Sequence, residues 1–382
     1  MQFDAIRPYT DSEVPRVISR LRASYELRDG FAGFLFPLLY RFSPPFARQV
    51  TRGLLWFRAR KFRTVHDVQM MTGRLIDHML NDTVAALSFD GLQRLDPAVP
   101  YVFVSNHRDI TLDSALLNRV LHGEGFPTCQ IAVGDNLFGT PFADDLMRLN
   151  RGFIVQRSAV GVKAQYAALK RTSAYIRNSV EEGVSVWIAQ REGRAKDGFD
   201  RTEPALLKML ALAYRDESRQ VGELTKRVQI VPVSISYELD PCDEQKAHEL
   251  WSIETHGSFE KSAGADQASI VAGVQGYKGR VHLSFSAPLD GEYGDAEQMA
   301  RALDEAIVGG LRVFPTNTDA DQLLGSSERE SSLPRLAKVT DMFNARIAAA
   351  SSVERPFLLR QYANVLRNRV ELGLEEQPVG RL

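Results

Sequence analysis

Short apolar runs rich in β-branched residues recur along the middle of the chain, separated by longer stretches with apolar residues at helical spacing. We predict strands at the short runs and helices between them. The predicted strands are residues 83–89, 101–105, 128–133, 152–156, 184–189, 229–237 and 281–286. The predicted helices between them are residues 111–122, 162–180, 204–214 and 295–313. Because strands alternate with helices, the expected fold class is α/β, with a largely parallel sheet flanked by helices.

The N-terminal part is predicted to be helical, and it mixes aromatic with basic residues. From Phe31 to Val65 the chain holds no acid and seven basic residues: Arg41, Arg48, Arg52, Arg58, Arg60, Lys61 and Arg63. Such a mixture suits a helix in a membrane interface, where rings lie at headgroup level and cations face anionic lipid. The expected partner of residues 31–63 is therefore an anionic membrane surface. The alternative is a helical subdomain with packed aromatic rings and solvated arginines. Nucleic acid is not expected as a partner, because no recognised binding motif accompanies these residues.

The C-terminal third is less regular. Residues 240–278 show no clear period and are expected to form an irregular excursion, residues 318–335 a linker, and the remaining tail a helical extension. These patterns divide the chain into three parts. They are an N-terminal helical membrane-interface region (1–84), an α/β domain (85–320) and a C-terminal helical extension (321–382).

Composition limits the possible classes of protein. The chain has 382 residues, 44% hydrophobic and 25% charged, which is ordinary for a globular protein. Its net charge of −1 implies no general affinity for polyanions. Cys129 and Cys242 lack metal-ligand spacing and indicate a reducing compartment. The N-terminus has early acids and no apolar signal-peptide core, and no run approaches the ~20 apolar residues that span a bilayer. We therefore expect a cytoplasmic protein, peripherally associated with the cytoplasmic face of the membrane and not secreted.

Candidate chemistry begins where one predicted strand ends. Residues 101–117 read YVFVSNHRDITLDSALL, so His107 follows a buried strand, and Thr111 can cap the next helix. Ligands of α/β folds bind outside the carboxyl ends of strands. A histidine beside a carboxylate at that place is a candidate general base with its orienting group. The carboxylate is Asp113 or, as an alternative, Asp109. A lone histidine at a strand end is more often an ordinary loop residue.

Two further predicted strands end in basic loops. Arg157 follows the strand at 152–156, and Glu192, Gly193, Arg194 and Lys196 follow the strand at 184–189. A base, a carboxylate and several cations together suit acyl transfer to an alcohol that bears phosphate, since guanidinium groups bind phosphate with two parallel hydrogen bonds. Taken singly, these arginines are weak evidence, because most surface arginines are solvated or paired.

In these loops the sequence resembles the glycerolipid acyltransferase family, which includes glycerol-3-phosphate and 1-acylglycerol-3-phosphate acyltransferases. The resemblance spans roughly residues 85–320. Four blocks occur in the family's order, and together they are a specific signal. They are Ser105-Asn106-His107-Arg108, Gly152-Phe153-Ile154-Val155-Gln156-Arg157, Glu192-Gly193-Arg194 and Ile230-Val231-Pro232-Val233. The stretch Val186–Lys196 also resembles the soluble plastid-type glycerol-3-phosphate acyltransferases, in which a helical domain precedes the catalytic one.

The first and third blocks depart from the family pattern. The family usually has four residues between the histidine and the aspartate, but five lie between His107 and Asp113. Asp113 remains the preferred partner, because the predicted helix start fixes its place. The third block lacks the usual proline before the glutamate and threonine after the glycine, and Gln190 and Arg191 stand in that approach. This departure affects the expected acceptor pocket more than the chemistry.

The resemblance implies direct attack without a covalent acyl-enzyme. His107, oriented by Asp113, would deprotonate the acceptor hydroxyl, which would then attack the thioester of acyl-CoA or acyl carrier protein. Arg157, Arg194 and Lys196 would hold the acceptor phosphate, and Glu192 would bind acceptor hydroxyls or pair with Arg157. No metal or organic cofactor is expected. The preferred acceptor is 1-acylglycerol 3-phosphate, used in phospholipid synthesis. The alternatives are glycerol 3-phosphate, a non-catalytic lipid-binding relative with an altered His-Asp motif, and a histidine-dependent thioesterase.

Overall fold

The computed structural model describes residues 3–137, 141–217, 220–262, 264–326 and 331–374. The side chains of Glu26, Leu27, Phe34, Arg58 and Pro141 lie outside this description. The backbone forms two compact units, each built from segments that are distant in the sequence. The first unit is Met1–Leu75 with Gln130–Tyr175, and the second is Ile76–Cys129 with Ile176–Leu382.

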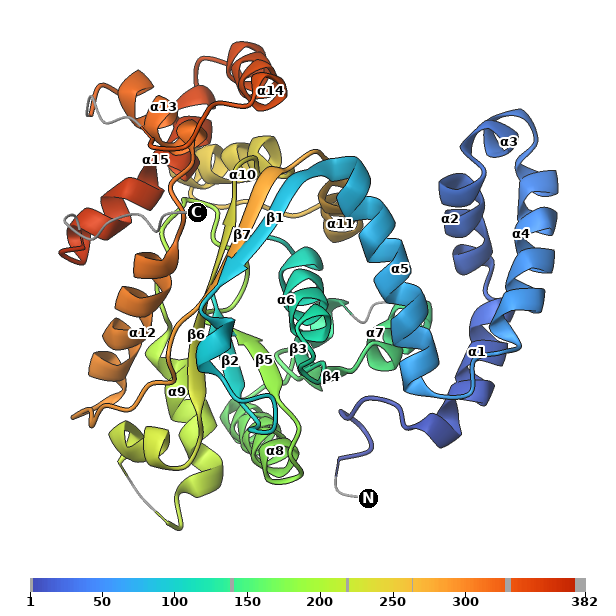
Figure 1. The fold of residues 1–382 in the computed structure, drawn as a ribbon, viewed down its shortest axis with the longest axis horizontal. Coiled ribbons are helices and arrows are strands. Elements are labelled where there is room, and N and C mark those ends of the chain that lie inside the picture. The colour runs from blue at the N-terminus through green and yellow to red at the C-terminus, as the bar shows by residue number, and fades with distance from the viewer. Residues whose placement is uncertain (1–2, 138–140, 218–219, 263, 327–330, 375–382) are drawn as a thin grey trace. The chain divides into compact units, whose positions relative to one another are not determined.

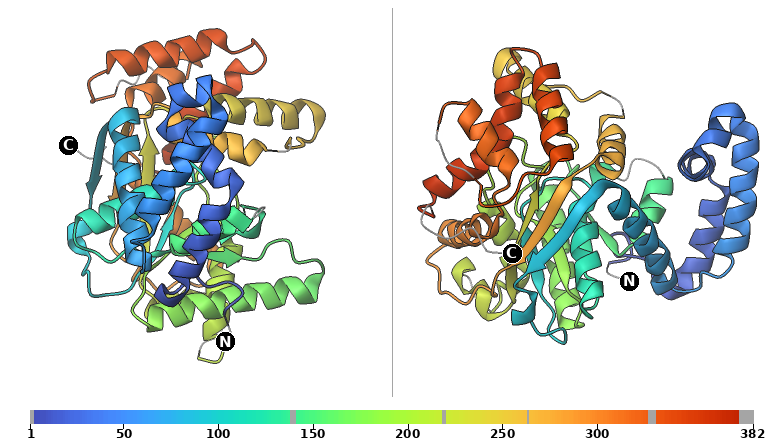
Figure 2. Two further views of the ribbon diagram at one scale, coloured as in Figure 1. Left: turned by 90° about the vertical axis from the view of Figure 1, so that its right-hand side faces the viewer. Right: turned by 45° about the horizontal axis from the view of Figure 1, so that its top comes forward.

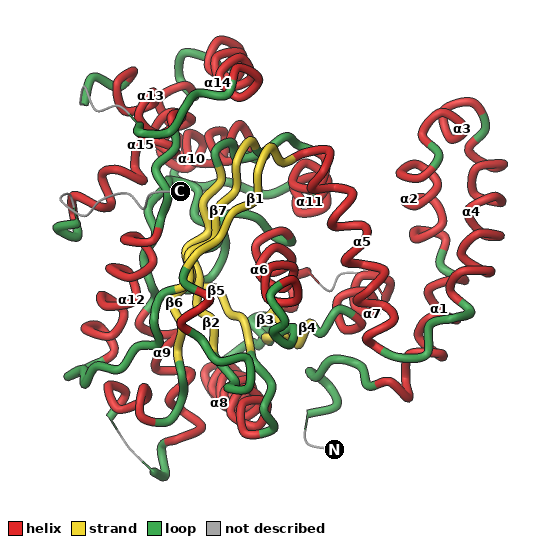
Figure 3. The backbone as a smooth tube through the Cα atoms, in the orientation of Figure 1, coloured by secondary structure: helices red, strands yellow, loops and turns green. Residues whose placement is uncertain are grey.

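Five strands form the sheet of the second unit, in the order β1-β7-β6-β2-β5 (Figures 1 and 3). Strand β2 is parallel to both of its neighbours, and β1 is parallel to β7. Only the β6–β7 pair among these is antiparallel. The α/β fold class with a largely parallel sheet is therefore confirmed. The strands are β1 (Val84–Asp90), β2 (Val102–Ser105), β5 (Val186–Ala189), β6 (Ile230–Tyr237) and β7 (Gly279–Phe285).

Helices cover both faces of this sheet, with α6 on one face and α9 and α12 on the other (Figure 1). This double cover explains why β2 is buried along its whole length and is apolar without alternation. The helices are α6 (Leu112–Gly123), α9 (Pro204–Ala211), α10 (Asp243–His256), α11 (Ala265–Gln275), α12 (Ala296–Gly310), α13 (Pro315–Leu323), α14 (Ala337–Ala349) and α15 (Arg355–Glu371).

The first unit combines a helical N-terminal part with a parallel pair of strands. Its core joins one face of α1 to α4, α5 and α7 through apolar side chains such as Val17, Ala59 and Leu149. The elements are α1 (Val14–Ala23), α2 (Tyr25–Leu35), α3 (Pro37–Phe42), α4 (Pro44–Ala59), α5 (Val65–Thr83), β3 (Gln130–Gly134), α7 (Pro141–Leu149), β4 (Gly152–Val155) and α8 (Val162–Glu181).

Two expectations for the C-terminal third were wrong. The excursion at 240–278 contains helices α10 and α11, and α13 occupies the start of the expected linker at 318–335. The pattern missed α10 because its buried residues include Asp243 and Lys246 beside Ala247, so its buried face is not apolar throughout. The helical tail is present as α14 and α15 (Figure 2). The three-part division at 84/85 and 320/321 stays a prediction, and residues 327–330 and 375–382 of its last part lie outside the described residues.

In the part of the chain that the structure describes, no helix combines the length and the apolar character that crossing a membrane requires.

Candidate active site

The register of the central strands brings two loops of the second unit together. Ser105 of β2 pairs with Ala189 of β5 and with Val233 of β6. Beyond this level β2 and β5 turn into loops, while β6 continues to Tyr237. We call residues 106–111 the catalytic loop and residues 190–200 the cation loop. Because parallel strands end at the same edge of a sheet, both loops arise side by side.

The side chain of Asn106 fixes the path of the catalytic loop. Its Nδ2 donates to the carbonyl of Ile235 at 3.0 Å, and its Oδ1 accepts from the Ile235 amide at 2.8 Å. The asparagine amide thus replaces the backbone pairing that β2 no longer supplies to β6. Asn106 is fully buried, so both hydrogen bonds are protected from water, and the next residue is held in one orientation.

His107 is paired with Asp113 in the first turn of α6. The His107 Nδ1 lies 2.8 Å from the Asp113 Oδ2. The same carboxylate oxygen accepts the backbone amides of Arg108 at 2.7 Å and Asp109 at 3.0 Å. The Asp113 side chain is 1% exposed and the His107 side chain 15% exposed. With Nδ1 donating to Asp113, Nε2 of His107 is the nitrogen left to accept a proton.

Tyr237, at the end of β6, completes the surroundings of Asp113. Its hydroxyl donates to the Asp113 Oδ1 at 2.8 Å, so both carboxylate oxygens are hydrogen-bonded. Burial and the neighbouring carboxylates of Asp113 and Asp109 raise the pKa of Tyr237 well above its usual value. The phenol therefore stays protonated and acts as a donor. Four hydrogen bonds hold the Asp113 carboxylate in place for His107.

Asp109, the alternative partner of His107, binds the start of α6 instead. Its Oδ1 accepts the backbone amides of Thr111 and Leu112, each at 2.9 Å. Asp109 therefore caps the start of α6, the place that the sequence assigned to Thr111, whose side chain makes no capping hydrogen bond. Burial, and then the charge of Asp113, raise the pKa of Asp109.

An aromatic side chain lies beside His107. The ring of Trp187 in β5 meets the His107 ring edge to face at 5.9 Å between centroids. Trp187 Nε1 donates to Ser105 Oγ at 2.9 Å, so the indole is itself fixed. The backbone amide of Ala195 donates to the His107 carbonyl at 2.8 Å, which joins the cation loop to the catalytic loop.

The four predicted site residues of the cation loop differ in their surroundings. Glu192 is exposed, and Gly193 has a φ of 72°, a left-handed turn that favours glycine. Arg194 is half-buried; its Nη2 donates to Ser269 Oγ at 3.3 Å. Among the described residues, its buried Nη1 has no hydrogen-bond partner. Lys196 forms an ion pair with Glu249 of α10. The free donor of Arg194 suits an anion more directly than Lys196 does.

Arg157 belongs to the first unit, where it follows β4. It lies against Gly134 of β3 and contributes to a lowered pKa of Asp135, whose carboxylate also accepts from Ser158. Its predicted part in binding the acceptor phosphate stays a prediction.

Sequence reasoning missed three residues that surround the predicted pair: Asn106, Trp187 and Tyr237. In the sequence, Asn106 stands out only as a member of the first block. Trp187 and Tyr237 lie within predicted strands, and the polar tip of a buried aromatic residue is a signal for a partner nearby. Within the described ranges, no group of three or more His, Cys, Asp or Glu side chains has the arrangement of a metal site.

One protein-family model matches the part of the chain that holds the candidate site. The acyltransferase family model matches residues 86–236, a stretch that includes His107, Asp113 and Arg194 and ends one residue before Tyr237. Residues 86–236, which hold the candidate site loops, are thus similar to acyltransferase domains.

Parts of the chain are also similar to individual acyltransferases. The chain is 23% identical over 216 residues to the dihydroxyacetone phosphate acyltransferase of Bos taurus, covering 56% of this chain and 30% of the relative. It is 31% identical over 157 residues to the glycerol-3-phosphate acyltransferase of Pseudoalteromonas atlantica, covering 41% and 17%. The chain thus spans less than a third of the length of these curated relatives. A solved structure, the 1-acyl-sn-glycerophosphate acyltransferase of Thermotoga maritima, is 16% identical over 74% of this chain and 94% of that one, with a TM-score of 0.38.

Proposed function

We propose that this protein transfers a fatty acyl group from a thioester to the hydroxyl of a phosphate-bearing glycerol derivative. The observation that carries this proposal is the buried Asp113 carboxylate hydrogen-bonded to His107 at a strand end, inside the matched acyltransferase stretch. Such a pair is a general base whose free nitrogen faces away from its orienting carboxylate.

The proposed reaction follows from this geometry. Nε2 of His107 removes the proton of the acceptor hydroxyl as the oxygen attacks the thioester carbonyl. The tetrahedral intermediate then collapses, the carbon–sulfur bond breaks, and the thiolate takes up the proton held by His107. Asp113 stabilises the imidazolium between these steps. A positioned base of this kind contributes about 10²–10⁴-fold in rate. Neither a metal nor an organic cofactor takes part in the proposed reaction.

The acceptor is proposed to be 1-acylglycerol 3-phosphate, and the donor acyl-CoA or acyl carrier protein. Arg194, with its free buried donor, is proposed to bind the acceptor phosphate. The alternative acceptor is glycerol 3-phosphate, which the names of two relatives favour. Both acceptors share the chemistry of a glycerol hydroxyl near a phosphate.

The test is release of free thiol from palmitoyl-CoA and from palmitoyl-acyl carrier protein. Each donor is offered without acceptor, with glycerol 3-phosphate and with lysophosphatidate. Acceptor-dependent thiol release, with an equal amount of ester formed, is the expected result. Equal release with and without acceptors would indicate a thioesterase instead. No turnover with either donor would indicate a lipid-binding relative.

We also propose that the helices of the first unit bind an anionic membrane surface. Helices α2 and α4 lie side by side and α3 joins them (Figures 1 and 2). Leu38 is 72% and Phe42 84% exposed, and Phe46, Trp56 and Phe57 are also exposed. The Arg60 guanidinium lies 4.5 Å from the Trp56 ring centroid. Exposed rings flanked by cations suit the headgroup region of a bilayer.

Vesicle binding tests this second proposal. Full-length protein is expected to bind vesicles with anionic headgroups more tightly than neutral ones, and to be released by salt. Replacing Phe42 and Phe46 with serine is expected to weaken binding about tenfold or more, since each ring buries apolar area. The matched control replaces Leu323 and Val353, which are exposed apolar residues of the second unit. Equal binding by the two double variants would contradict the proposal.

A further inference from the structure

The helices between β6 and β7 contact both loops of the candidate site. Four polar side chains of α10 and α11 contact the two loops directly or through one another. They are Gln245, Lys246 and Glu249 of α10 and Ser269 of α11. These helices occupy the stretch in which the sequence shows no apolar period. Polar side chains of these helices meet the two loops, while apolar residues of α10 such as Ala247 pack against α15.

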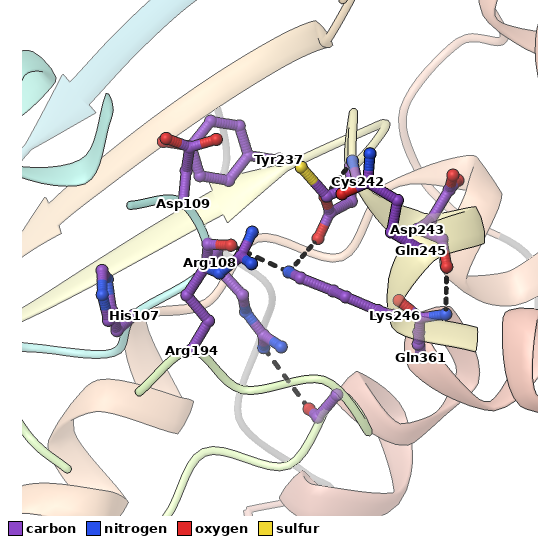
Figure 4. Close-up of polar contacts among 12 residues, drawn as sticks. His107, Arg108, Asp109, Arg194, Tyr237, Cys242, Asp243, Gln245, Lys246 and Gln361 are labelled. Carbon is purple, nitrogen blue, oxygen red and sulfur yellow. Dashed lines mark hydrogen bonds and ion pairs between the residues drawn. The ribbon is translucent and has the colours of Figure 1, made fainter. Parts of the chain in front are cut away.

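Lys246 is the contact to the catalytic loop. Its side chain is 2% exposed, and its Nζ donates to the Arg108 carbonyl at 2.8 Å and to the Asp240 carboxylate (Figure 4). Arg108 is the residue after His107, and its own amide donates to Asp113. The peptide groups on either side of Arg108 are thus both held by buried charged groups. A shift of this backbone would move His107 relative to Asp113.

The cation loop is held by the same two helices. Arg194 Nη2 donates to Ser269 Oγ, and the Ser269 hydroxyl donates to Gln245 Oε1 at 2.8 Å. This chain of hydrogen bonds fixes the guanidinium plane from one side. The other guanidinium nitrogen, Nη1, is buried and without a partner among the described residues. Glu249 separately pairs with Lys196 in the same loop.

The start of α10 is anchored in turn by the C-terminal helices. The Asp243 carboxylate accepts from Arg346 of α14 at 2.7 Å and from the hydroxyl of Tyr362 in α15. Gln361 Nε2 donates to the Asp243 carbonyl at 2.9 Å (Figure 4). The three helices lie together in the second unit (Figure 2). Helix α10 is therefore fixed at one end and contacts the site loops along its length.

We infer that α10 and α11 are a positioning element for acyl transfer, in which Lys246 fixes the catalytic loop and the Ser269–Gln245 pair orients Arg194. None of these three residues touches the reacting atoms; each acts through a neighbour. The inference rests on the proposed function, and it assigns separate kinetic effects to two residues of one element. Lys246 affects the chemical step, and Ser269 affects binding of the acceptor phosphate.

The first variant is Lys246→Met, which keeps roughly the length of the side chain and removes its hydrogen bonds to the Arg108 carbonyl and the Asp240 carboxylate. It is expected to lower kcat about tenfold or more and to change the acceptor KM less than about threefold. Misplacing His107 raises the barrier to acyl transfer without removing contacts that bind the acceptor. Lys246→Met removes the lysine partner of the half-buried Asp240 carboxylate, so the double variant Lys246→Met/Asp240→Asn is measured beside it. The double variant is expected to regain thermal stability and to keep the low kcat.

The second variant is Ser269→Ala. It is expected to raise the acceptor KM about 3–10-fold with kcat within about twofold, because one hydrogen bond that orients Arg194 is lost. The matched controls are Lys261→Met and Ser252→Ala, which change the same residue types at outer positions of this stretch. Both controls are expected to keep wild-type constants.

A third measurement does not depend on turnover. Hydrogen exchange of the Arg108 and Asp109 amides, which donate to Asp113, is expected to be at least about tenfold faster in the double variant than in wild type. Unchanged exchange, or equal changes of kcat and KM in both variants, would overturn the inference while leaving the proposed function standing. Absence of acyl transfer by the wild-type protein would overturn the proposed function, and the exchange result would still decide whether Lys246 fixes the loop.

Discussion

Replacing Asp113 with asparagine removes the charge next to His107 while retaining a side chain of the same shape. The Asp113 Oδ2 accepts from His107, Arg108 and Asp109, and its Oδ1 accepts from Tyr237. The introduced amide can keep its oxygen towards the three N–H donors and turn its nitrogen towards the tyrosine hydroxyl, which can also accept. The fold and the histidine tautomer are therefore expected to survive, and the loss is electrostatic.

The size of the effect follows from the geometry. Unit charges about 4 Å apart interact by about 4 kcal/mol at an effective dielectric constant of about 20. The backbone amides of Arg108 and Asp109 and the Tyr237 hydroxyl already stabilise part of the carboxylate charge, so about 2–4 kcal/mol remains for the imidazolium. Since about 1.4 kcal/mol corresponds to tenfold, kcat is expected to fall about 30–1000-fold in Asp113→Asn.

The assay is steady-state acyl transfer, with Asp109→Asn as the matched comparison. The Asp109 Oδ1 accepts the amides of Thr111 and Leu112 at the start of α6, and an asparagine oxygen can accept both. Its replacement is expected to change kcat less than about threefold, because asparagine is an equally good helix cap. A larger loss of kcat in Asp109→Asn than in Asp113→Asn would refute the reasoning.

Three further predictions address neighbouring groups. Tyr237→Phe leaves the Asp113 Oδ1 without its donor, so kcat is expected to fall about 3–10-fold in steady-state assays; an unchanged kcat would mean that Tyr237 does not support Asp113. Arg194→Ala is expected to raise the acceptor KM far more than the donor KM, because its free Nη1 faces no protein acceptor among the described residues; equal effects on both substrates would contradict phosphate binding. Burial, with the nearby Arg312, lowers the pKa of His282 to about 4 in the folded protein. At a pH between about 4 and 6.5, His282 is therefore neutral in the folded protein but protonated in the unfolded chain. Stability is therefore lost as the pH falls from about 6.5 towards 4, amounting to about 2 kcal/mol between pH 7.5 and 5. His282→Gln is expected to remove this part of the pH dependence in urea unfolding; the same dependence in both proteins would exclude His282 as its source.

The strands of the central sheet were predictable from the sequence, because a strand buried on both faces is a short run of consecutive apolar residues. The stretches 102–104 and 186–189 are short, continuously apolar runs, and their parallel pairing follows from the helices between them. The His107–Asp113 pairing was also predictable, since the strand end fixes one residue and the helix start the other. Both signals are local, within a few residues along the chain.

What the sequence did not predict depends on contacts between distant residues. Tyr237 and Asp113 are 124 residues apart, and Lys246 and Arg108 are 138 residues apart. No local period encodes such pairs. Helix α10 was missed for a related reason: it buries Asp243 and Lys246, whose partners lie on other elements, and a polar buried face resembles an exposed one in sequence. Antiparallel pairing of β6 with β7 likewise depends on how the chain returns after α11.

The central claim is that His107 is the base of an acyl transfer, and the most direct measurement compares wild type with His107→Ala. Both proteins are given a labelled acyl thioester with glycerol 3-phosphate and with lysophosphatidate, and labelled ester is quantified together with free thiol. The account predicts acceptor-dependent ester formation by wild type, and a loss of at least about 10²-fold in the folded variant. Near wild-type ester formation by a folded His107→Ala protein would contradict it.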